Sequence, residues 1–170
     1  ADDRDRRREQ EAATLAAAAL AIEVGATPAG VAAALRAYEK GAHRVQPVGE
    51  VDGVRFVDDS KATNVHAALA AIRGFDRAVL IAGGRNKGLD LTPLRTGADH
   101  LVAVVAIGDA GPEVAAAFGD AVPVTVVASM ADAVRAAHAY ARPGDVVLLS
   151  PACASFDWYR SYAERGDDFA

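Results

Sequence analysis

Cysteine, excess positive charge and long apolar runs are all scarce in this sequence, and each scarcity excludes a class of protein. The single cysteine, Cys153, cannot form an internal disulfide framework or a cysteine zinc site, which fits a cytoplasmic protein. The formal net charge of −5 argues against a general nucleic-acid-binding protein, because such proteins carry a basic face. The longest apolar run, Ala12–Ile22, has about half of the ~20 residues that a membrane-spanning helix needs. We therefore expect neither a nucleic acid nor a membrane among the partners.

Apolar residues are plentiful, but many of them are small. The 170 residues suffice for one domain with a short appendage, and 52% of them are hydrophobic. Alanine accounts for 41 residues, and because each alanine buries little surface, the core is smaller than the hydrophobic fraction suggests. Leu, Ile, Val and Phe still recur in clusters, so a folded core is expected.

The first 42 residues predict two helices and no strand. An Ala-rich segment over residues 1–24 has high helix propensity, and Gly25 ends it. Thr27 and Pro28 form an N-cap followed by a proline at the first helical position, which predicts a second helix over residues 28–40. The pattern then changes, so we expect a helical segment over 1–42 and a separate domain over 43–170.

Residues 43–170 predict an α/β domain: a Rossmann-like, mostly parallel sheet of about six strands with helices on both faces. It begins with a β-hairpin, because Asp52-Gly53 separates two β-rich runs, and continuous apolar strands then alternate with helices. The expected strands cover residues 45–51, 54–58, 78–82, 101–107, 124–128 and 146–149. The expected helices cover residues 64–73, 91–98, 112–118, 130–141 and 156–164. The spacing of the late aromatic residues indicates core packing for the last helix; these are Phe156, Trp158, Tyr159, Tyr162 and Phe169.

Polar or glycine-rich segments follow four of the expected strands, over residues 58–64, 83–88, 108–109 and 150–155. Ligands of open α/β sheets bind beyond the carboxyl ends of the strands, and the carboxyl ends of parallel strands share one edge. The sequence therefore predicts a small-molecule site at this edge.

The segment Asp59–Asn64 admits two interpretations. It holds a carboxylate, an ammonium and two hydroxyls at a strand end that opens a helix, and such groups bind a ribose, a phosphate or an amino acid. Alternatively, Ser60 or Thr63 caps the helix while Asp59 and Lys61 form a solvated pair. The pattern alone weighs the two evenly.

Two of the other polar segments carry weaker signals. Gly83–Gly88 could place backbone N–H groups and Lys87 around an anion, but its spacing is not that of a phosphate-binding loop, and a flexible turn is favoured for glycines alone. Ser150–Ser155 lacks a G-x-S-x-G elbow, and a lone cysteine among small residues is typical of buried packing. Because the four histidines are scattered, neither covalent catalysis nor a metal site is expected.

Together, these segments resemble the C-terminal domain of the Mur ligase family. The motifs that carry the resemblance are Asp58-Asp59-Ser60-Lys61-Ala62-Thr63-Asn64, the Gly83-Gly84…Lys87-Gly88 turn, and Leu148-Leu149-Ser150-Pro151-Ala152-Cys153-Ala154-Ser155-Phe156-Asp157 with Arg165-Gly166-Asp167…Phe169. They resemble the members that add D-glutamate, since other Mur ligases and the folylpolyglutamate synthetases have a strand-end motif with Asp, His and Pro. The resemblance covers residues 42–170, and residues 12–41 resemble helices that close the family's central domain.

This resemblance implies the C-terminal, D-glutamate-binding domain of an ATP-dependent ligase. The members that it resembles join D-glutamate to UDP-N-acetylmuramoyl-L-alanine through an acyl phosphate in peptidoglycan biosynthesis, with ATP and Mg²⁺ as cofactors of the full-length enzyme. The family's phosphate-binding loop, modified lysine, metal ligands and uridine-nucleotide domain match nothing here, and an asparagine signature expected near Glu9, Gln10 and Ala13 is missing. The resemblance therefore implies that the central and N-terminal domains are missing and that this chain alone is inactive.

The resemblance also implies roles for individual residues, and no catalytic residue is certain among them. The D-glutamate carboxylates would be held by Lys87, Thr63, Ser155 and Phe156, with Tyr162 beside them, because a dianionic substrate needs an ammonium, hydroxyls and N–H donors. The residues expected on the nucleotide side are His43, Arg44, Asp59, Lys61 and Asn64.

Two other classes compete with this hypothesis. A non-catalytic Rossmann-like binding or interaction module is the alternative, since the residues that would activate ATP are absent and one architecture hosts many functions. A nucleotide-binding domain of an oxidoreductase ranks last, because no G-x-G-x-x-G follows the early strands.

Overall fold

The computed structural model describes residues 3–38 and 41–170, with side chains described from Ala12 onward. The chain divides into two compact units, Ala1–Gly41 and Ala42–Ala170. We call them the helical pair and the α/β unit.

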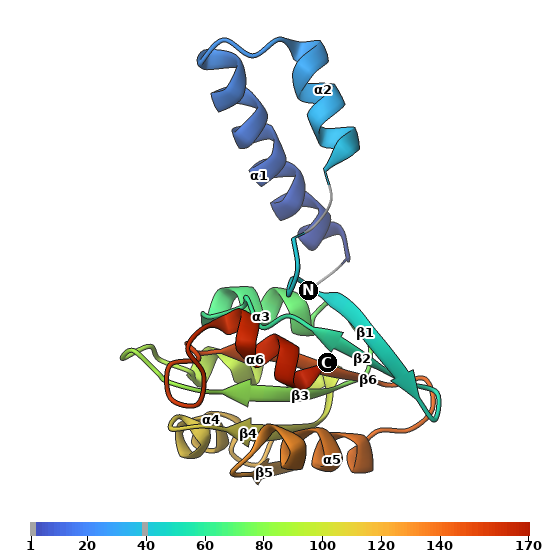
Figure 1. Cartoon of the computed structure of the whole chain (residues 1–170), viewed down its shortest axis with the longest axis vertical. Helices are drawn as coiled ribbons and strands as arrows, with labels where there is room; N and C mark the ends of the chain where they lie inside the picture. Colours follow the sequence, from blue (N-terminus) through green and yellow to red (C-terminus); the bar gives the residue numbers. More distant parts are fainter. Residues whose placement is uncertain (1–2, 39–40) are drawn as a thin grey trace. The chain divides into compact units, whose positions relative to one another are not determined.

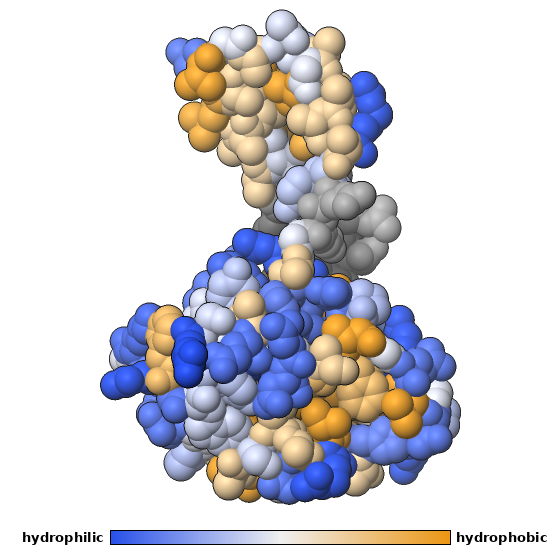
Figure 2. All heavy atoms as spheres, in the orientation of Figure 1, coloured by the Kyte–Doolittle hydropathy of each residue, from blue (hydrophilic) through white to orange (hydrophobic). Residues whose placement is uncertain are grey.

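The helical pair consists of α1 (Asp3–Glu23) and α2 (Pro28–Ala37) (Figure 1). Thr27 caps α2 as predicted, since its Oγ1 accepts a hydrogen bond of 3.1 Å from Gly30 N. The second helix is shorter than predicted, because Tyr38 already has extended backbone angles. The predicted helical residues 1–2 and 39–40 lie outside the described residues. No residue of α2 is buried, and apolar side chains cover much of the visible face of this unit (Figure 2).

The α/β unit is built on one six-stranded sheet in the order β1-β2-β6-β3-β4-β5. Its strands are β1 (Gln46–Val51), β2 (Val54–Asp58), β3 (Ala78–Gly83), β4 (Leu101–Ile107), β5 (Val124–Val126) and β6 (Val146–Ala152). Its helices are α3 (Val65–Ile72), the 3₁₀ helix η1 (Thr92–His100), α4 (Gly111–Phe118), α5 (Met130–Tyr140) and α6 (Tyr162–Phe169). Only β1 runs antiparallel, so the predicted fold class is confirmed.

The predicted hairpin joins β1 to β2. Asp52 and Gly53 both have positive φ, 52° and 74°, which is the backbone of a tight turn that suits the twist of the two strands. The strand alternation then produces two core layers. On β3, Leu80 and Ala82 face the layer made with α3, η1 and α4, whereas Val79 and Ile81 face the layer made with α5 and α6.

The last helix is the largest correction to the predicted elements. It begins at Tyr162 rather than near residue 156, because Ser161 Oγ accepts a 3.1 Å hydrogen bond from Glu164 N and caps the helix there. Glu164 in turn accepts a bond from Arg160 N at 2.8 Å. Phe156 therefore lies in a loop and is 55% exposed, so its predicted place in the core is wrong. Trp158 and Tyr159 do pack against the core, but from that loop.

Smaller corrections concern element length and type. The segment predicted as a helix over 91–98 is the 3₁₀ helix η1, whose interior Gly97 disfavours a regular α-helix. Strand β5 is shorter than predicted, and β6 is three residues longer. Among the described helices, none is both long and apolar enough to span a bilayer.

The strand order reverses direction at β6. The connections from β2 through β3 and β4 to β5 cross one face of the sheet, and α5 returns across the other face to insert β6 between β2 and β3. The chain after β6 continues into α6 on the α5 face, whereas the chains after β2 and β3 turn to the opposite face. Loops that leave neighbouring strands toward opposite faces open a crevice at the carboxyl ends, where such folds bind ligands.

Candidate functional site

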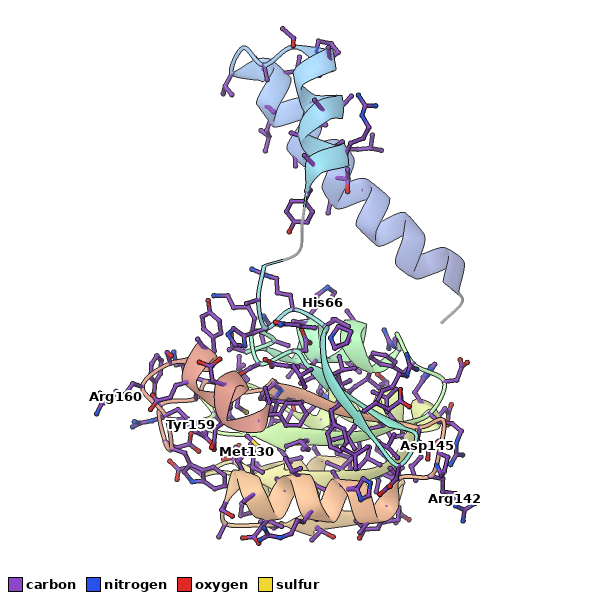
Figure 3. The ribbon with its side chains drawn as sticks, turned by 45° about the vertical axis from the view of Figure 1, so that its right-hand side comes forward. His66, Met130, Arg142, Asp145, Tyr159 and Arg160 are labelled. Atoms are coloured by element: carbon purple, nitrogen blue, oxygen red, sulfur yellow. The ribbon has the colours of Figure 1, made fainter. Side chains whose placement is uncertain are left out.

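Backbone hydrogen bonds fasten the strand-end loops to one another. Ala152 N donates to Ala62 O at 2.9 Å, which joins the loops after β6 and β2. Arg85 and Ala154 form an antiparallel bridge, with bonds of 2.8 and 3.2 Å, that joins the loops after β3 and β6. The structure thus brings the polar segments 58–64, 83–88 and 150–155 to one edge. Figure 3 shows this edge at the side of Tyr159 and Arg160, with Arg142 and Asp145 at the opposite end.

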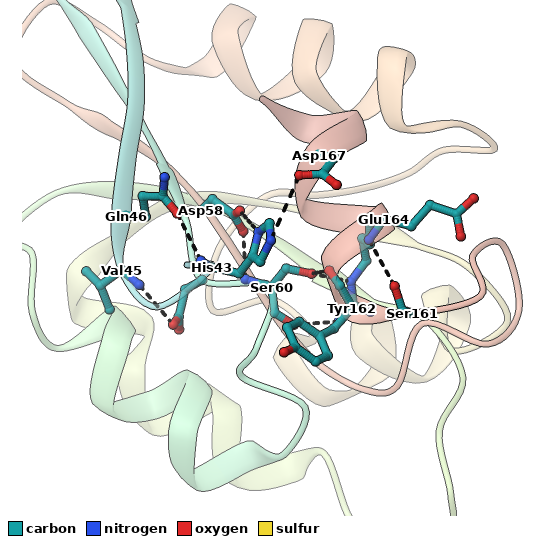
Figure 4. A network of polar contacts seen from close by, with 11 residues as sticks. His43, Val45, Gln46, Asp58, Ser60, Ser161, Tyr162, Glu164 and Asp167 are labelled. Atoms are coloured by element: carbon teal, nitrogen blue, oxygen red, sulfur yellow. Dashed lines mark hydrogen bonds and ion pairs between the residues drawn. The ribbon is translucent and has the colours of Figure 1, made fainter. Parts of the chain in front are cut away.

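His43 and Asp58 form a polar pair where the chain enters the α/β unit (Figure 4). His43 Nδ1 lies 2.6 Å from Asp58 Oδ2, and because a carboxylate only accepts, Nδ1 is the donor. His43 Nε2 lies 3.9 Å from Asp167 Oδ1, and the imidazole meets the Tyr162 ring edge to face at 5.9 Å. A Cβ at Gly166 would lie 2.3 Å from His43 Nδ1, so only glycine lets α6 approach this pair.

Asp59, the residue after Asp58, is buried. Its Oδ2 accepts a 2.8 Å bond from Ser150 Oγ, and its Oδ1 accepts a 3.2 Å bond from Val45 N. Burial raises the pKa of Asp59 to about 6, with repulsion from Asp58 acting in the same direction, while the Ser150 and Val45 bonds oppose the shift. The predicted solvated pair of Asp59 with Lys61 is therefore wrong.

Two lysines stand against aromatic rings at this edge. Lys61 Nζ lies 3.7 Å from the centre of the Tyr162 ring, and Lys87 Nζ lies 5.3 Å from the centre of the Phe156 ring. The first contact joins the loop after β2 to α6, and the second joins the loop after β3 to the loop after β6. Arg44 is exposed beside Asp59, whose pKa it lowers slightly. This edge thus presents two ammonium groups, which suit a ligand with anionic groups.

The remaining predicted residues have structural partners. Asn64 caps α3, since its Oδ1 accepts a 2.9 Å bond from Ala67 N, so the cap is neither Ser60 nor Thr63. Thr63 is half-buried, and Ser155 is buried with its carbonyl bonded to Tyr159 N.

The glycine-rich segment is a tightly held turn, so the flexible turn favoured by the sequence pattern is not what the structure shows. A Cβ at Gly83 would lie 2.0 Å from Ile107 O, and Gly83 and Gly84 both have positive φ. Asn86 closes the loop by accepting from Leu89 N and donating to Leu89 O, each at 2.9 Å. These constraints fix the backbone that carries Lys87.

Sequence reasoning assigned no role to Arg165, although this residue stands in the quoted Arg165-Gly166-Asp167 motif. It is 1% exposed and donates to Ser60 Oγ, Ser60 O and Cys153 O. The sequence signal that could have identified Arg165 is its position within the amphipathic final helix.

The Cys153 thiol is unsuited to nucleophilic chemistry. Burial raises its pKa to about 11, so the reactive thiolate is scarce near neutral pH. Among the described residues, no cluster of three or more His, Cys, Asp or Glu side chains could hold a metal ion.

The fold and this site define a family. The model of the Mur ligase, glutamate ligase domain matches residues 43–153, so the chain belongs to the Mur ligase family. Curated relatives carry a more particular name, UDP-N-acetylmuramoylalanine–D-glutamate ligase. The protein of that name from Frankia casuarinae is 52% identical over 160 residues, which cover 92% of this chain and 34% of the relative. Those from Pseudomonas fluorescens and Burkholderia mallei are 48% and 50% identical and cover 91% of the chain. The chain thus spans about a third of their length.

Solved structures support the fold independently of sequence. UDP-N-acetylmuramate-alanine ligase from Thermotoga maritima superposes with a TM-score of 0.63 at 14% identity, over 92% of this chain and 35% of that one. The murein peptide ligase from Psychrobacter arcticus gives 0.61 at 18% identity, over 82% of this chain and 33% of that one.

Proposed function

We propose that this chain is the D-glutamate-binding C-terminal domain of an ATP-dependent ligase. The longer protein joins D-glutamate to UDP-N-acetylmuramoyl-L-alanine in peptidoglycan biosynthesis. The observation that carries the proposal is about 50% identity to ligases of that name over more than nine tenths of the chain. It fits a sheet edge that offers the Lys87 ammonium to a dianionic amino acid.

The D-glutamate side of the site consists of Lys87, Thr63, Ser155, Phe156 and Tyr162. We propose that the Lys87 ammonium and the Thr63 hydroxyl hold the carboxylates, and that Ser155 and Phe156 contribute backbone N–H donors. The tight Gly83–Gly88 turn holds the ammonium in place, which keeps the D-glutamate amine oriented toward the carbon it attacks.

The nucleotide side consists of Arg44, Asp59 and Lys61 in this proposal. ATP supplies the phosphoryl group that activates the muramoyl-alanine carboxylate; the D-glutamate amine then forms the amide bond as phosphate leaves. Arg44 would meet a phosphate and Asp59 a ribose. His43 and Asn64 are reassigned to positioning roles, because Asp58 engages the His43 ring and the α3 N-terminus engages the Asn64 side chain.

The missing parts of the enzyme lie in other domains under this proposal. The predicted helical segment, residues 1–42, is proposed to be the end of the central domain, and the relatives' coverage of 91–92% of the chain reaches beyond the α/β unit into it. Mg²⁺ is proposed to bind outside this chain, because the described residues offer no cluster of ligands for it. We propose a cytoplasmic location, where the nucleotide substrates are made.

Calorimetric titration of the chain with D-glutamate tests the proposal. We expect binding of D-glutamate, weaker binding of L-glutamate, and a dissociation constant raised about tenfold or more by Lys87→Ala, since one charge-assisted bond contributes about 1.5–3 kcal/mol. Arg142→Ala, which removes an exposed cation at the opposite end of the sheet, is the matched control and should change nothing (Figure 3).

The full-length ligase provides the second readout. Lys87→Ala should raise KM for D-glutamate and lower kcat, whereas this chain alone should form no product from ATP, D-glutamate and the muramoyl substrate. An unchanged D-glutamate KM would remove Lys87 from the site, and turnover by the chain alone would show that it is more than a binding domain.

A further inference from the structure

Arg165 is the largest fully buried side chain among the described residues. It extends from α6 beneath the carboxyl ends of the strands. Burial lowers the pKa of Arg165 only to about 10, so the guanidinium stays charged at neutral pH. Arg165 belongs to neither the D-glutamate side nor the nucleotide side of the proposed site. Another role must therefore explain why an arginine is buried at this position.

The guanidinium contacts three strand-end loops at once. Nε donates to Ser60 Oγ and Nη2 to Ser60 O, both at 2.9 Å, in the loop after β2. Nη1 donates to Cys153 O at 3.1 Å, in the loop after β6. A Cβ on Gly84 would lie 3.0 Å from Nη1, so the loop after β3 also rests against the guanidinium.

Each contact is close in sequence to a residue proposed to hold D-glutamate. Ser60 lies three residues before Thr63 and, through its Oγ, donates a 2.6 Å bond to Tyr162 O. Cys153 lies two residues before Ser155. The Arg85–Ala154 bridge continues the connection to the turn that carries Lys87. The Arg165 guanidinium therefore connects the three loops that hold the residues of the predicted amino-acid subsite.

The hydrogen-bond partners of this cation are neutral. All three of its hydrogen bonds within the described chain end on hydroxyl or carbonyl oxygens, while the carboxylates of Asp157 and Asp58 act on its charge without a hydrogen bond. A buried charge carries a desolvation cost that an apolar side chain of similar volume would avoid. Five N–H donors in a rigid plane do what an apolar side chain cannot: they fix carbonyl groups of separate loops at set distances.

We propose that Arg165 is the positioning residue of the amino-acid subsite, holding the loops after β2, β3 and β6 at the spacing that D-glutamate requires. This inference rests on the proposed function. Arg165 does not touch the substrate; it acts through Ser60 and Cys153.

Arg165→Lys tests the proposal in this chain, because lysine keeps the charge but cannot bridge three loops. Far-UV circular dichroism establishes that the variant is folded, and binding is measured well below its unfolding midpoint. We expect the dissociation constant for D-glutamate to rise about tenfold or more, because displaced loops weaken at least one charge-assisted hydrogen bond to the ligand. The emission of Trp158, the sole tryptophan, should shift because it lies in the loop between β6 and α6.

Two further variants complete the test. Arg160→Lys changes an exposed arginine of the same loop and should leave binding and emission unaltered. Ser60→Ala removes the acceptor for Arg165 Nε and the hydrogen bond to Tyr162 O. This variant should weaken D-glutamate binding a few-fold. It tests the positioning role if Arg165→Lys does not fold. Unchanged D-glutamate affinity in a folded Arg165→Lys, or in Ser60→Ala alone where the former is unfolded, overturns the positioning role. Failure of the unsubstituted chain to bind D-glutamate instead overturns the proposed function, and this inference with it.

Discussion

The helical pair and the α/β unit use the same alanine-rich composition in opposite ways. In α2 no residue is buried, and six of the ten exposed large hydrophobic side chains of the described chain lie between residues 15 and 38. In the α/β unit, strands β3 and β6 are buried along their whole length, and the core continues on both faces of the sheet. The helices of the pair therefore rest on local propensity and capping, whereas the α/β unit rests on tertiary packing.

This difference teaches where a mutation should matter. An exposed leucine on α1 loses little when truncated, because its surroundings are already water. A leucine of the α/β core loses both its transfer free energy and its packing contacts. Three predictions test this contrast. The first two compare a substitution in the α/β unit with one in the helical pair, and the third compares a variant with the unsubstituted chain.

Truncating one leucine in each unit should give the largest difference. Leu94→Ala, at a position of 0% exposure on η1, should lower the free energy of unfolding by about 3–5 kcal/mol. Leu20→Ala, at 69% exposure on α1, should change it by less than about 0.5 kcal/mol. Urea denaturation followed by circular dichroism measures both, and equal losses would contradict the contrast.

Adding one methyl group gives the second test. Helix propensity alone predicts that Gly166→Ala stabilises α6 by about 1 kcal/mol. The structure predicts the opposite sign, a loss of about 3 kcal/mol, because the new Cβ would collide with His43 and Asp58. Gly41→Ala, where no atom lies within 4 Å of an added Cβ, should be nearly neutral. Thermal unfolding decides the sign, and a stabilised Gly166→Ala would refute the close approach of α6 to the His43–Asp58 pair.

The pH dependence of stability gives the smallest effect and isolates Asp59. Its pKa is raised from 3.8 to about 6 in the fold, so between these values the folded state binds more protons than the unfolded state. The contribution of Asp59 is then most favourable at low pH and falls as pH rises through about 6. Relative to the unsubstituted chain, Asp59→Asn should gain roughly 2 kcal/mol between about pH 4.5 and 6.5. Parallel stability curves for the two proteins would contradict the burial of this carboxylate.

The sequence was a good guide to the sheet and a poorer one to the segments between strands. Continuous apolar runs such as Leu101–Ile107 predicted buried parallel strands, because only a strand covered on both faces has no polar side. The hairpin followed from Asp52-Gly53 for a local reason. The start of α6 was missed because aromatic spacing from Phe156 imitates a helix, while the capping pair Ser161 and Glu164 sets the true start.

The candidate site was predicted to the level of its edge, but its internal contacts were not. Strand-end polarity and the family motifs pointed to Asp59, Lys61 and Lys87 together. Lys61 contacts Tyr162, and Arg165 hydrogen-bonds Ser60, each across about a hundred positions of the sequence. No local sequence pattern encodes contacts between residues that far apart. Asn64 looked like a ligand because capping and ligand binding use the same side-chain oxygen.

The buried thiol of Cys153 is a natural probe of how often the end of β6 opens. A thiol that is 1% exposed, with its pKa raised to about 11, reacts with an alkylating reagent only while the end of β6 is open. Because the carbonyl of the same residue accepts the Arg165 bond, that opening also releases the guanidinium from its loop. The rate at which Cys153 is labelled therefore reports how often the strand ends part, without any introduced probe.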